Sequence, residues 1–260
     1  MLKKLSVIAV SAIALATSAT SLAKETLLER INAKGTITVG TEGTYAPFTY
    51  HDASGKLTGY DVEVTRAVAE KLGVKVDFKE TQWDAMLAGL KADRFDLVAN
   101  QVGLTTPERQ ATFDKSAAYS WSGAALVVRN DEQKIKQASD VKGVKTAQTL
   151  SSNYGELARA NGADIVPIDG MAQGLLLIQQ KRADATFNDN LALLDYLKKN
   201  PKSGLKIVWE SPEKVDAGFI ANKGNQEALN KISAAIGELH KDGTLKKLGE
   251  QFFGRDISVK

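Results

Sequence analysis

Residues 95–116 read FDLVANQVGLTTPERQATFDKS, and they join an apolar run to a polar turn that ends near one arginine. The run FDLVA has the composition of a buried strand. It leads into Asn100-Gln101 and a glycine, after which two threonines and a proline interrupt regular structure before Arg109. Because ligand sites of α/β proteins form where strands end, this stretch predicts a binding site around Arg109.

Strands and helices alternate on both sides of this stretch. The expected strands cover residues 36–40, 74–78, 95–99, 144–148, 165–168 and 184–187. Helices with one apolar face are expected between them, and residues 226–253 should be helical with a break at Lys241-Asp242-Gly243. This alternation predicts an α/β fold with parallel strands and right-handed crossovers.

The chain repeats one pattern in its two halves. RFDLVANQ at residues 94–101 and RADATFND at residues 182–189 share an arginine, an acid and a terminal asparagine followed by a polar residue. Two apolar segments, 124–129 and 217–222, could cross between halves. We therefore expect two lobes, with residues 24–127 plus 219–260 forming the first and an inserted second lobe at 128–218.

The first residues have the form of an export signal. Lys3 and Lys4 precede a short apolar run, and Ser21-Leu22-Ala23 resembles a cleavage site. The run is shorter than the roughly 20 residues that a spanning helix needs. A signal peptide over residues 1–23, cleaved after Ala23 on the Sec pathway, predicts a periplasmic protein.

Composition argues against several functions. The chain has no cysteine and two histidines, so neither a thiolate or histidine metal site nor a cysteine nucleophile is expected. Without Lys3 and Lys4 the 34 basic residues become 32, against 31 acidic residues, and the net charge falls from +3 to +1. That balance gives no basic footprint for nucleic acid.

A family resemblance rests on motifs spread over the chain. They are TYAPF at 44–48, GYDVEV at 59–64, FDLVANQ followed by TPERQ, SSNY at 151–154, Asn188-Asp189 and KDGTLKKLGEQFFG at 241–254. Their order is similar to that of periplasmic substrate-binding proteins for polar amino acids, which serve ABC importers. The resemblance implies a type II two-lobed fold, each lobe a mainly parallel sheet flanked by helices, with two crossover strands as a hinge. It also implies a monomer without cofactor that closes on a free amino acid and docks on the importer's membrane permease subunits.

The resemblance also implies a site suited to a zwitterion. Arg109 would bind the ligand carboxylate through two parallel donors, with help from the helix start at Ser152, and Asp189 would bind the ammonium. Tyr45 and Trp83 would sandwich the apolar part of the ligand, and Glu42 would contact its side chain or ammonium. The full expected set is Glu42, Tyr45, Trp83, Asn100, Gln101, Val102, Gly103, Thr105, Arg109, Ser151, Ser152, Asn153, Asn188 and Asp189.

Some alternatives stay open at this point. The run NQV at 100–102, Trp83 and the ending FFGRD are most similar to cystine- and cysteine-binding members, but glutamine or another polar amino acid would also fit. Leu104 stands where relatives often carry a serine or threonine, so Thr105 or the Val102 carbonyl would have to take that role. Asp61 is expected to cap a helix.

Two other classes of protein compete with this interpretation. A dehydratase-like enzyme on the same scaffold could use Glu42, Glu210 or Asp216 as a general acid. An adhesin or sensor is also conceivable, but the sequence contains neither a repeat array nor an interaction tail.

Overall fold

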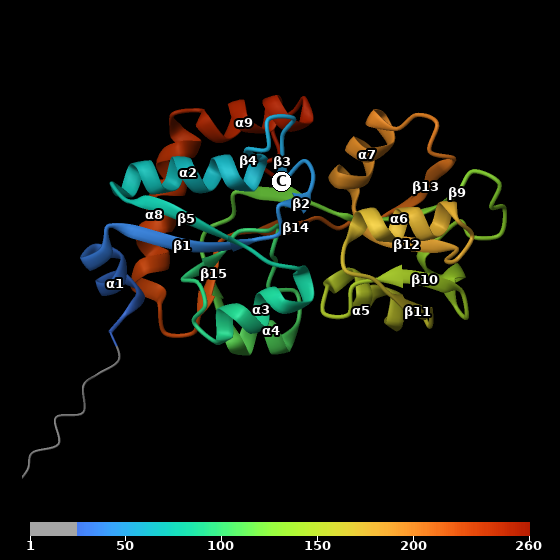
Figure 1. The fold of residues 1–260 in the computed structure, drawn as a ribbon, viewed down its shortest axis with the longest axis horizontal. Helices are drawn as coiled ribbons and strands as arrows, with labels where there is room; N and C mark the ends of the chain where they lie inside the picture. The colour runs from blue at the N-terminus through green and yellow to red at the C-terminus, as the bar shows by residue number, and fades with distance from the viewer. Residues whose placement is uncertain (1–24) are drawn as a thin grey trace, which may run out of the picture.

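The computed structural model describes residues 25–260, which form two lobes side by side, joined by a narrow connection (Figure 1). The α/β two-lobed fold expected from the sequence is therefore confirmed. The expected signal peptide, residues 1–23, lies outside the described residues. Within residues 25–260, no helix has the length and apolar character needed to cross a membrane.

The first lobe is built on a five-stranded sheet of order β5-β1-β6-β15-β7. Strands β1, β5 and β6 are parallel, whereas β15 runs antiparallel to β6 and β7. The strands are β1 (Thr36–Thr41), β5 (Lys75–Glu80), β6 (Leu97–Val98), β7 (Phe113–Lys115) and β15 (Ile220–Asn222). Helices α1 (Leu27–Lys34), α2 (Tyr60–Leu72), α8 (Gln226–Lys241) and α9 (Thr244–Phe253) share one core cluster, and α3 (Trp83–Lys91) packs in another beside α4 (Pro107–Thr112).

The second lobe repeats this plan with a sheet of order β11-β10-β12-β9-β13. Here β10, β11 and β12 are parallel, and β9 runs antiparallel to β12 and β13. The strands are β9 (Ala124–Arg129), β10 (Lys145–Gln148), β11 (Asp164–Pro167), β12 (Ala185–Asp189) and β13 (Leu205–Glu210). Helices α6 (Met171–Gln179) and α7 (Asn190–Lys199) lie on one side, with α5 (Asn153–Ala160) and the 3₁₀ turn η1 (Ala138–Val141) on the other (Figure 1).

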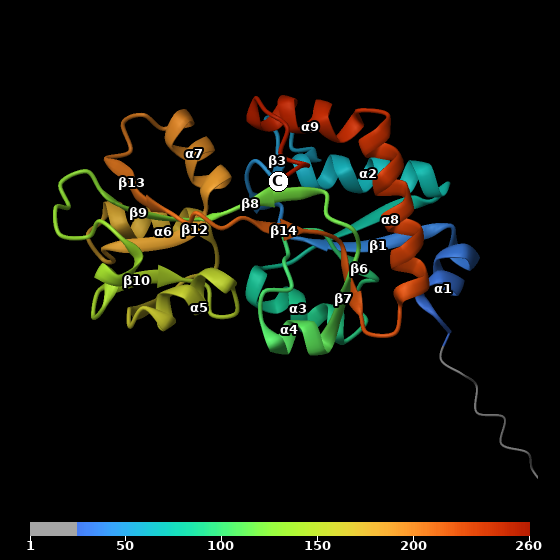
Figure 2. The same cartoon turned by 180° about the vertical axis from the view of Figure 1, so that it is seen from behind.

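The lobes are connected by two strands that pair with each other, β8 (Ser120–Ser122) and β14 (Val215–Ala217). In the view from behind, both lie at the edge of the first lobe that faces the second lobe (Figure 2). The expected crossing segments 124–129 and 217–222 begin later in the chain than these two connecting strands and overlap them only at residue 217. Among the described residues, strand β9 pairs with β12 and β13 of the second sheet, so the expected boundary after residue 127 falls inside this strand, and the chain changes sheets earlier, at Gly123.

Local sequence signals predicted the ends of α8 and α9 correctly, but the helix start predicted at Asp61 was wrong. The break at Lys241-Asp242-Gly243 separates α8 from α9, as expected. In contrast, Gly59 is the N-cap of α2, and Asp61 lies inside the first turn, so the prediction that Asp61 caps this helix was wrong. A small sheet of β2 (Thr44–Tyr45), β3 (Thr49–His51) and β4 (Leu57–Thr58) fills residues 44–58 and was not expected.

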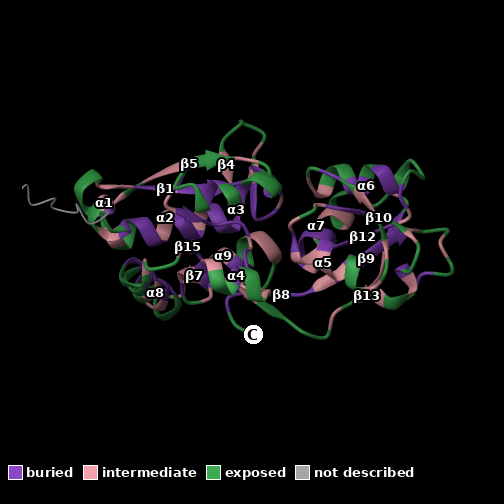
Figure 3. Ribbon diagram, turned by 90° about the horizontal axis from the view of Figure 1, so that it is seen from below, coloured by how far each residue is buried: buried purple, intermediate pink, exposed green. Residues whose placement is uncertain are grey.

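The largest core cluster lies under this small sheet. Phe48 is fully buried, and its ring contacts those of Tyr45 and Phe253 at centroid distances of 5.4 Å and 5.2 Å. Buried residues continue along β1 and α2, whereas the outer faces of α8 and α9 are exposed (Figure 3). Phe48 thus connects the strand that carries Tyr45 to the C-terminal helix.

Replacing Phe48 with alanine should lower the free energy of unfolding by about 3–5 kcal/mol, because a buried aromatic ring leaves a cavity that its neighbours fill only in part. Urea unfolding followed by circular dichroism measures this. Leu176→Ala, at a leucine that is 49% exposed, is the control and should change stability by no more than about 0.5 kcal/mol. Equal effects of the two changes would contradict the packing role of Phe48.

Candidate functional site

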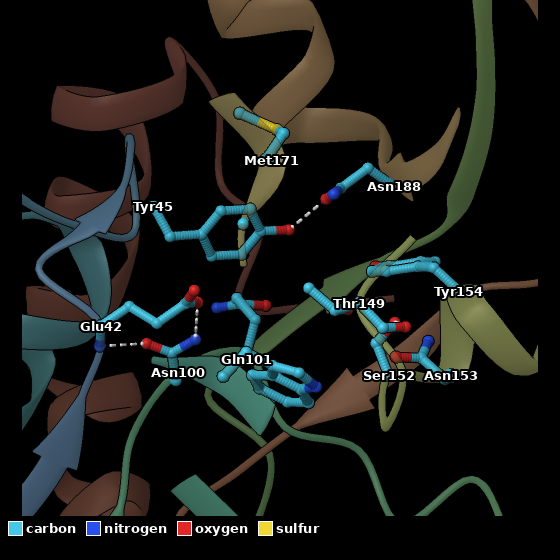
Figure 4. A pocket seen from close by; sticks show the side chains of 12 residues that line it. Glu42, Tyr45, Asn100, Gln101, Thr149, Ser152, Asn153, Tyr154, Met171 and Asn188 are labelled. Atoms are coloured by element: carbon cyan, nitrogen blue, oxygen red, sulfur yellow. Dashed lines mark hydrogen bonds between the residues drawn. The ribbon is translucent and has the colours of Figure 1, made fainter. Parts of the chain in front are cut away.

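A pocket lies between the lobes, where strands of both sheets end (Figure 4). Residues of the first lobe line one side, and residues of the second lobe line the other. The lining residues are Glu42, Tyr45, Trp83, Asn100, Gln101, Thr149, Ser152, Asn153, Tyr154, Gly170, Met171 and Asn188. Carboxylate, amide, hydroxyl and aromatic groups therefore converge on one space, a surface suited to a small polar molecule.

Glu42 and Asn100 hold each other at adjacent strand ends. Glu42 follows β1 and Asn100 follows β6, and these two strands are paired. The Glu42 backbone N–H donates to Asn100 Oδ1 at 2.8 Å, and Asn100 Nδ2 donates to Glu42 Oε2 at 2.6 Å. Burial outweighs this hydrogen bond and, with the nearby charge of Asp84, raises the pKa of Glu42 to about 7.

Tyr45 reaches across the pocket to the other lobe. Its hydroxyl donates to Asn188 Oδ1 at 2.7 Å, as Figure 4 shows. Asn188 lies near the end of β12, which has the same place in its sheet as β6 in the first. The repeated asparagines noted in the sequence, Asn100 and Asn188, thus occupy equivalent positions on opposite walls of one pocket.

Gln101 is held by a buried carboxylate. Its φ of 51° is in the left-handed region, which a non-glycine residue adopts only when its surroundings fix it. Asp61, fully buried, accepts from the Gln101 backbone N–H and from its Nε2, both at 2.6 Å, and Ser120 donates to the amide oxygen. Burial raises the pKa of Asp61 to about 7 against these bonds. Asp61 therefore shapes the pocket wall without lining the pocket.

Arg109 is a buried cation between the lobes. Its side chain packs over the Trp83 ring, with its central carbon 5.7 Å from the ring centroid. Within residues 25–260 its side-chain hydrogen bonds go to carbonyl oxygens, Gly103 at 3.2 Å and Ser151 at 2.7 Å, rather than to a carboxylate. Burial lowers its pKa from the usual value. Such a cation is well placed to receive an anion.

Asp189 lies just behind the pocket wall as the N-cap of α7. One carboxylate oxygen accepts the Leu191 N–H at 2.8 Å and the Ala192 N–H at 3.4 Å. The other accepts hydroxyl bonds from Ser122 and from Tyr154, the latter at 3.2 Å. Burial is the largest influence and raises the pKa of Asp189 to about 6.

The structure brings most of the expected site residues to this pocket. Those that line it are Glu42, Tyr45, Trp83, Asn100, Gln101, Ser152, Asn153 and Asn188. Gly103 and Thr105 line a neighbouring cavity on the hinge side, and Arg109 and Ser151 line another beyond Trp83. Val102 is buried in the core, and its carbonyl accepts the Gly218 N–H.

Four lining residues were not expected: Thr149, Tyr154, Gly170 and Met171. Tyr154 belongs to the SSNY motif at 151–154, and that motif could have predicted its place in the pocket. Thr149 follows β10, and Gly170 is the N-cap of α6 after β11. The rule that ligands bind at strand ends could have identified these two.

Comparison with known proteins shows which family this chain belongs to. Residues 37–255 match the model of the bacterial extracellular solute-binding proteins, family 3. The chain belongs to this family of extracytoplasmic binding proteins, which favours a binding protein over the enzyme and adhesin alternatives. One relative is the L-cystine-binding protein TcyA of Bacillus subtilis, 51% identical over 88% of this chain and 85% of that protein.

Two solved structures differ in how closely their sequences and their overall shapes match this chain. The L-cystine solute receptor of Neisseria gonorrhoeae in its unliganded open conformation is 74% identical over 90% of this chain and 99% of that one, with a TM-score of 0.61. An ancestral arginine-binding protein bound to arginine is only 37% identical over 85% and 99%, yet its TM-score is 0.79. The more similar sequence thus has the less similar overall shape.

The raised pKa of Glu42 should make stability depend on pH. The folded, ligand-free protein holds a proton on Glu42 up to about pH 7, whereas the unfolded chain loses it near the ordinary value of 4.5. Stability from this group is therefore present at low pH and lost as pH rises, by about 2 kcal/mol between pH 5 and pH 7. Thermal unfolding at both pH values measures it.

Glu42→Gln is the matched variant because glutamine cannot ionise. Asp61 and Asp189, which also have raised pKa values, remain in both proteins and cancel in the comparison. The variant should gain more stability over the wild type at pH 7 than at pH 5. An equal difference at both pH values would mean that Glu42 keeps an ordinary pKa.

Proposed function

We propose that this protein binds L-cystine or L-cysteine between its lobes and delivers it to an ABC importer. The observation that carries the proposal is the pocket itself: Glu42 lines a space walled by Tyr45 and Trp83, and the buried side chains of Asp189 and Arg109 lie close behind its walls. An amino acid carries the opposite charges to these groups at its two ends. The L-cystine-binding relatives, 51% and 74% identical, support this choice of ligand.

In the proposed complex, Arg109 binds the α-carboxylate. Arg109 is 5% exposed, and its guanidinium donates to the Ser151 carbonyl just before α5, close to the pocket residue Ser152. A carboxylate would offer two oxygens to the two arms that now donate to carbonyls. The N–H groups at the start of α5 add further donors from the second lobe.

The ammonium groups are assigned to the acids. Asp189 takes the α-ammonium, with Tyr154 moving its hydroxyl bond to make room, because the donors to Asp189 Oδ2 in the described part of the chain are two hydroxyl groups. L-cystine has a second ammonium, and among residues 25–260 the Glu42 carboxylate on the opposite wall has one side-chain donor, Asn100. Tyr45 and Trp83 then contact the apolar middle of the ligand.

Lobe closure is the proposed mechanism of capture. Direct bonds such as Tyr45 to Asn188 already join the lobes in this structure. The higher TM-score with an arginine-bound protein than with a more identical open one supports a closed arrangement here. A ligand that contacts both walls favours this arrangement by the contacts that only the closed form allows.

The remaining parts of the proposal concern the cell. Export through the signal peptide, with cleavage after Ala23, places the protein in the periplasm. It acts there as a monomer without a cofactor, and its partners are the permease subunits of the importer. Mass spectrometry of the exported protein and size-exclusion chromatography with light scattering test the cleavage site and the oligomeric state.

A thermal-shift screen with the common amino acids plus L-cystine tests the ligand. Ligand at about a hundredfold over its Kd adds about 2.7 kcal/mol of stability, which raises Tm by several degrees for a protein of this size. L-cystine or L-cysteine should give the largest shift. A larger shift with another amino acid would reassign the ligand, and no shift with any would refute amino-acid binding.

Arg109→Ala should weaken ligand binding at least a hundredfold, because losing one partner of a buried ion pair costs roughly 3–5 kcal/mol. Arg109→Lys should also bind poorly, since an ammonium cannot supply two parallel donors. Titration calorimetry measures both, with Arg94→Ala, at an exposed arginine of the same lobe, as control. Binding by Arg109→Ala within fivefold of wild type would exclude the carboxylate role.

A further inference from the structure

A second set of contacts joins the lobes outside the pocket, at the loop that precedes α5. The Asp84 carboxylate, on the first turn of α3 in the first lobe, accepts three hydrogen bonds from this loop in the second lobe. Its Oδ2 accepts the Leu150 N–H at 3.0 Å, and its Oδ1 accepts the Ser151 N–H at 2.9 Å and the Ser151 Oγ–H at 2.7 Å. One side chain thus holds two successive backbone groups and a hydroxyl of the other lobe.

Other groups fix the same loop in place. Arg109 of the first lobe donates to the Ser151 carbonyl at 2.7 Å. The first lobe therefore binds both the backbone N–H and the backbone carbonyl of Ser151. Within the second lobe, Arg159 donates to the Leu150 carbonyl at 3.0 Å. The carboxylate also lies at the N-terminal end of α5, where negative charge is favoured.

Asp84 is not part of the pocket wall. It lines the neighbouring cavity beyond Trp83, whereas Trp83, the preceding residue, lines the pocket. Leu150 is 52% exposed, so these contacts form at the rim of the gap between the lobes. If the lobes separate, the three donors and the carboxylate become exposed to water. When the lobes close again, the three hydrogen bonds form without any ligand group.

We propose that Asp84 is a positioning residue whose hydrogen bonds to Leu150 and Ser151 form a clasp between the lobes. The clasp favours the closed form without contacting ligand and thereby slows ligand release. This inference rests on the proposed binding function, but the clasp itself operates in the ligand-free protein. Affinity depends on the population of the closed form as well as on ligand contacts. The clasp therefore sets part of the affinity from outside the pocket.

The ligand-free test measures the distance between the lobes. The chain contains no cysteine, so dyes can be placed at Ala53→Cys in the first lobe and Lys202→Cys in the second, both at exposed positions. Single-molecule energy transfer then reports the closed fraction. Asp84→Asn and Asp84→Ala should lower it relative to the wild type.

Ser151→Ala approaches the clasp from the other lobe. It removes one of the three bonds and should lower the closed fraction less than Asp84→Ala does. Asp77→Asn is the control, because this exposed acid pairs with Lys79 on the same strand. Urea unfolding checks that each variant is folded, and Ser151→Ala keeps the test decisive if the Asp84 variants are unstable.

The ligand arm uses L-cystine and stopped-flow kinetics. Asp84→Ala should raise the release rate about tenfold while the association rate stays within about twofold, since bonds made after encounter act mainly on release. A pocket residue, in contrast, would change which amino acid is preferred, and Asp84→Ala should leave that order unchanged.

The outcomes separate the two proposals. An unchanged closed fraction and release rate in both Asp84 variants would overturn the clasp, although wild-type binding would still support the function. If the wild type binds no amino acid, the proposed function fails, and the ligand-free measurement still decides whether Asp84 holds the lobes together.

Discussion

The antiparallel entry of one strand into each sheet is the constraint on which the site depends. Strand β9 leaves the hinge strand β8 and runs antiparallel to β12, so β12 must end where β9 begins, beside the hinge. Strand β15 leaves β14 and does the same to β6. Both sheets therefore direct the carboxyl ends of their parallel strands into one gap, which is where ligands of α/β proteins bind.

Three acids lie around that gap, Asp61 and Asp189 buried and Glu42 half-buried, and each is held by polar neighbours that the fold supplies. Asp61 accepts from Gln101, Asp189 from the first turn of α7, and Glu42 from Asn100. These bonds do not fully offset the loss of water, which is why all three acids have raised pKa values. In the proposed complex a cationic ligand group would supply the missing charge at Glu42 and Asp189, whereas Asp61 stays behind Gln101.

Local sequence signals predicted the elements well and the long-range contacts less well. Apolar periodicity and the glycine after Asp242 located the helices, and the repeated asparagines identified equivalent strand ends. The partner of Asp61 was missed because Gln101 is distant in sequence, and a helix N-terminus explains an aspartate locally without it. The hinge was expected too far along the chain because β9 is as apolar as a crossing segment, although it is a buried inner strand of the second sheet.

The proposed clasp and the buried acids act on lobe closure in opposite directions. Asp84 favours closure whether or not the pocket is filled, since its donors belong to the protein. Closing an empty pocket removes water from Glu42, so its carboxyl group must stay protonated or, above about pH 7, keep a charge without a cation, which disfavours closure. In the proposed complex a ligand ammonium would remove that cost, so Glu42 would make closure depend on the ligand, while Asp84 would slow reopening. Under the two proposals together, the ligand would be held tightly while the empty protein could still open.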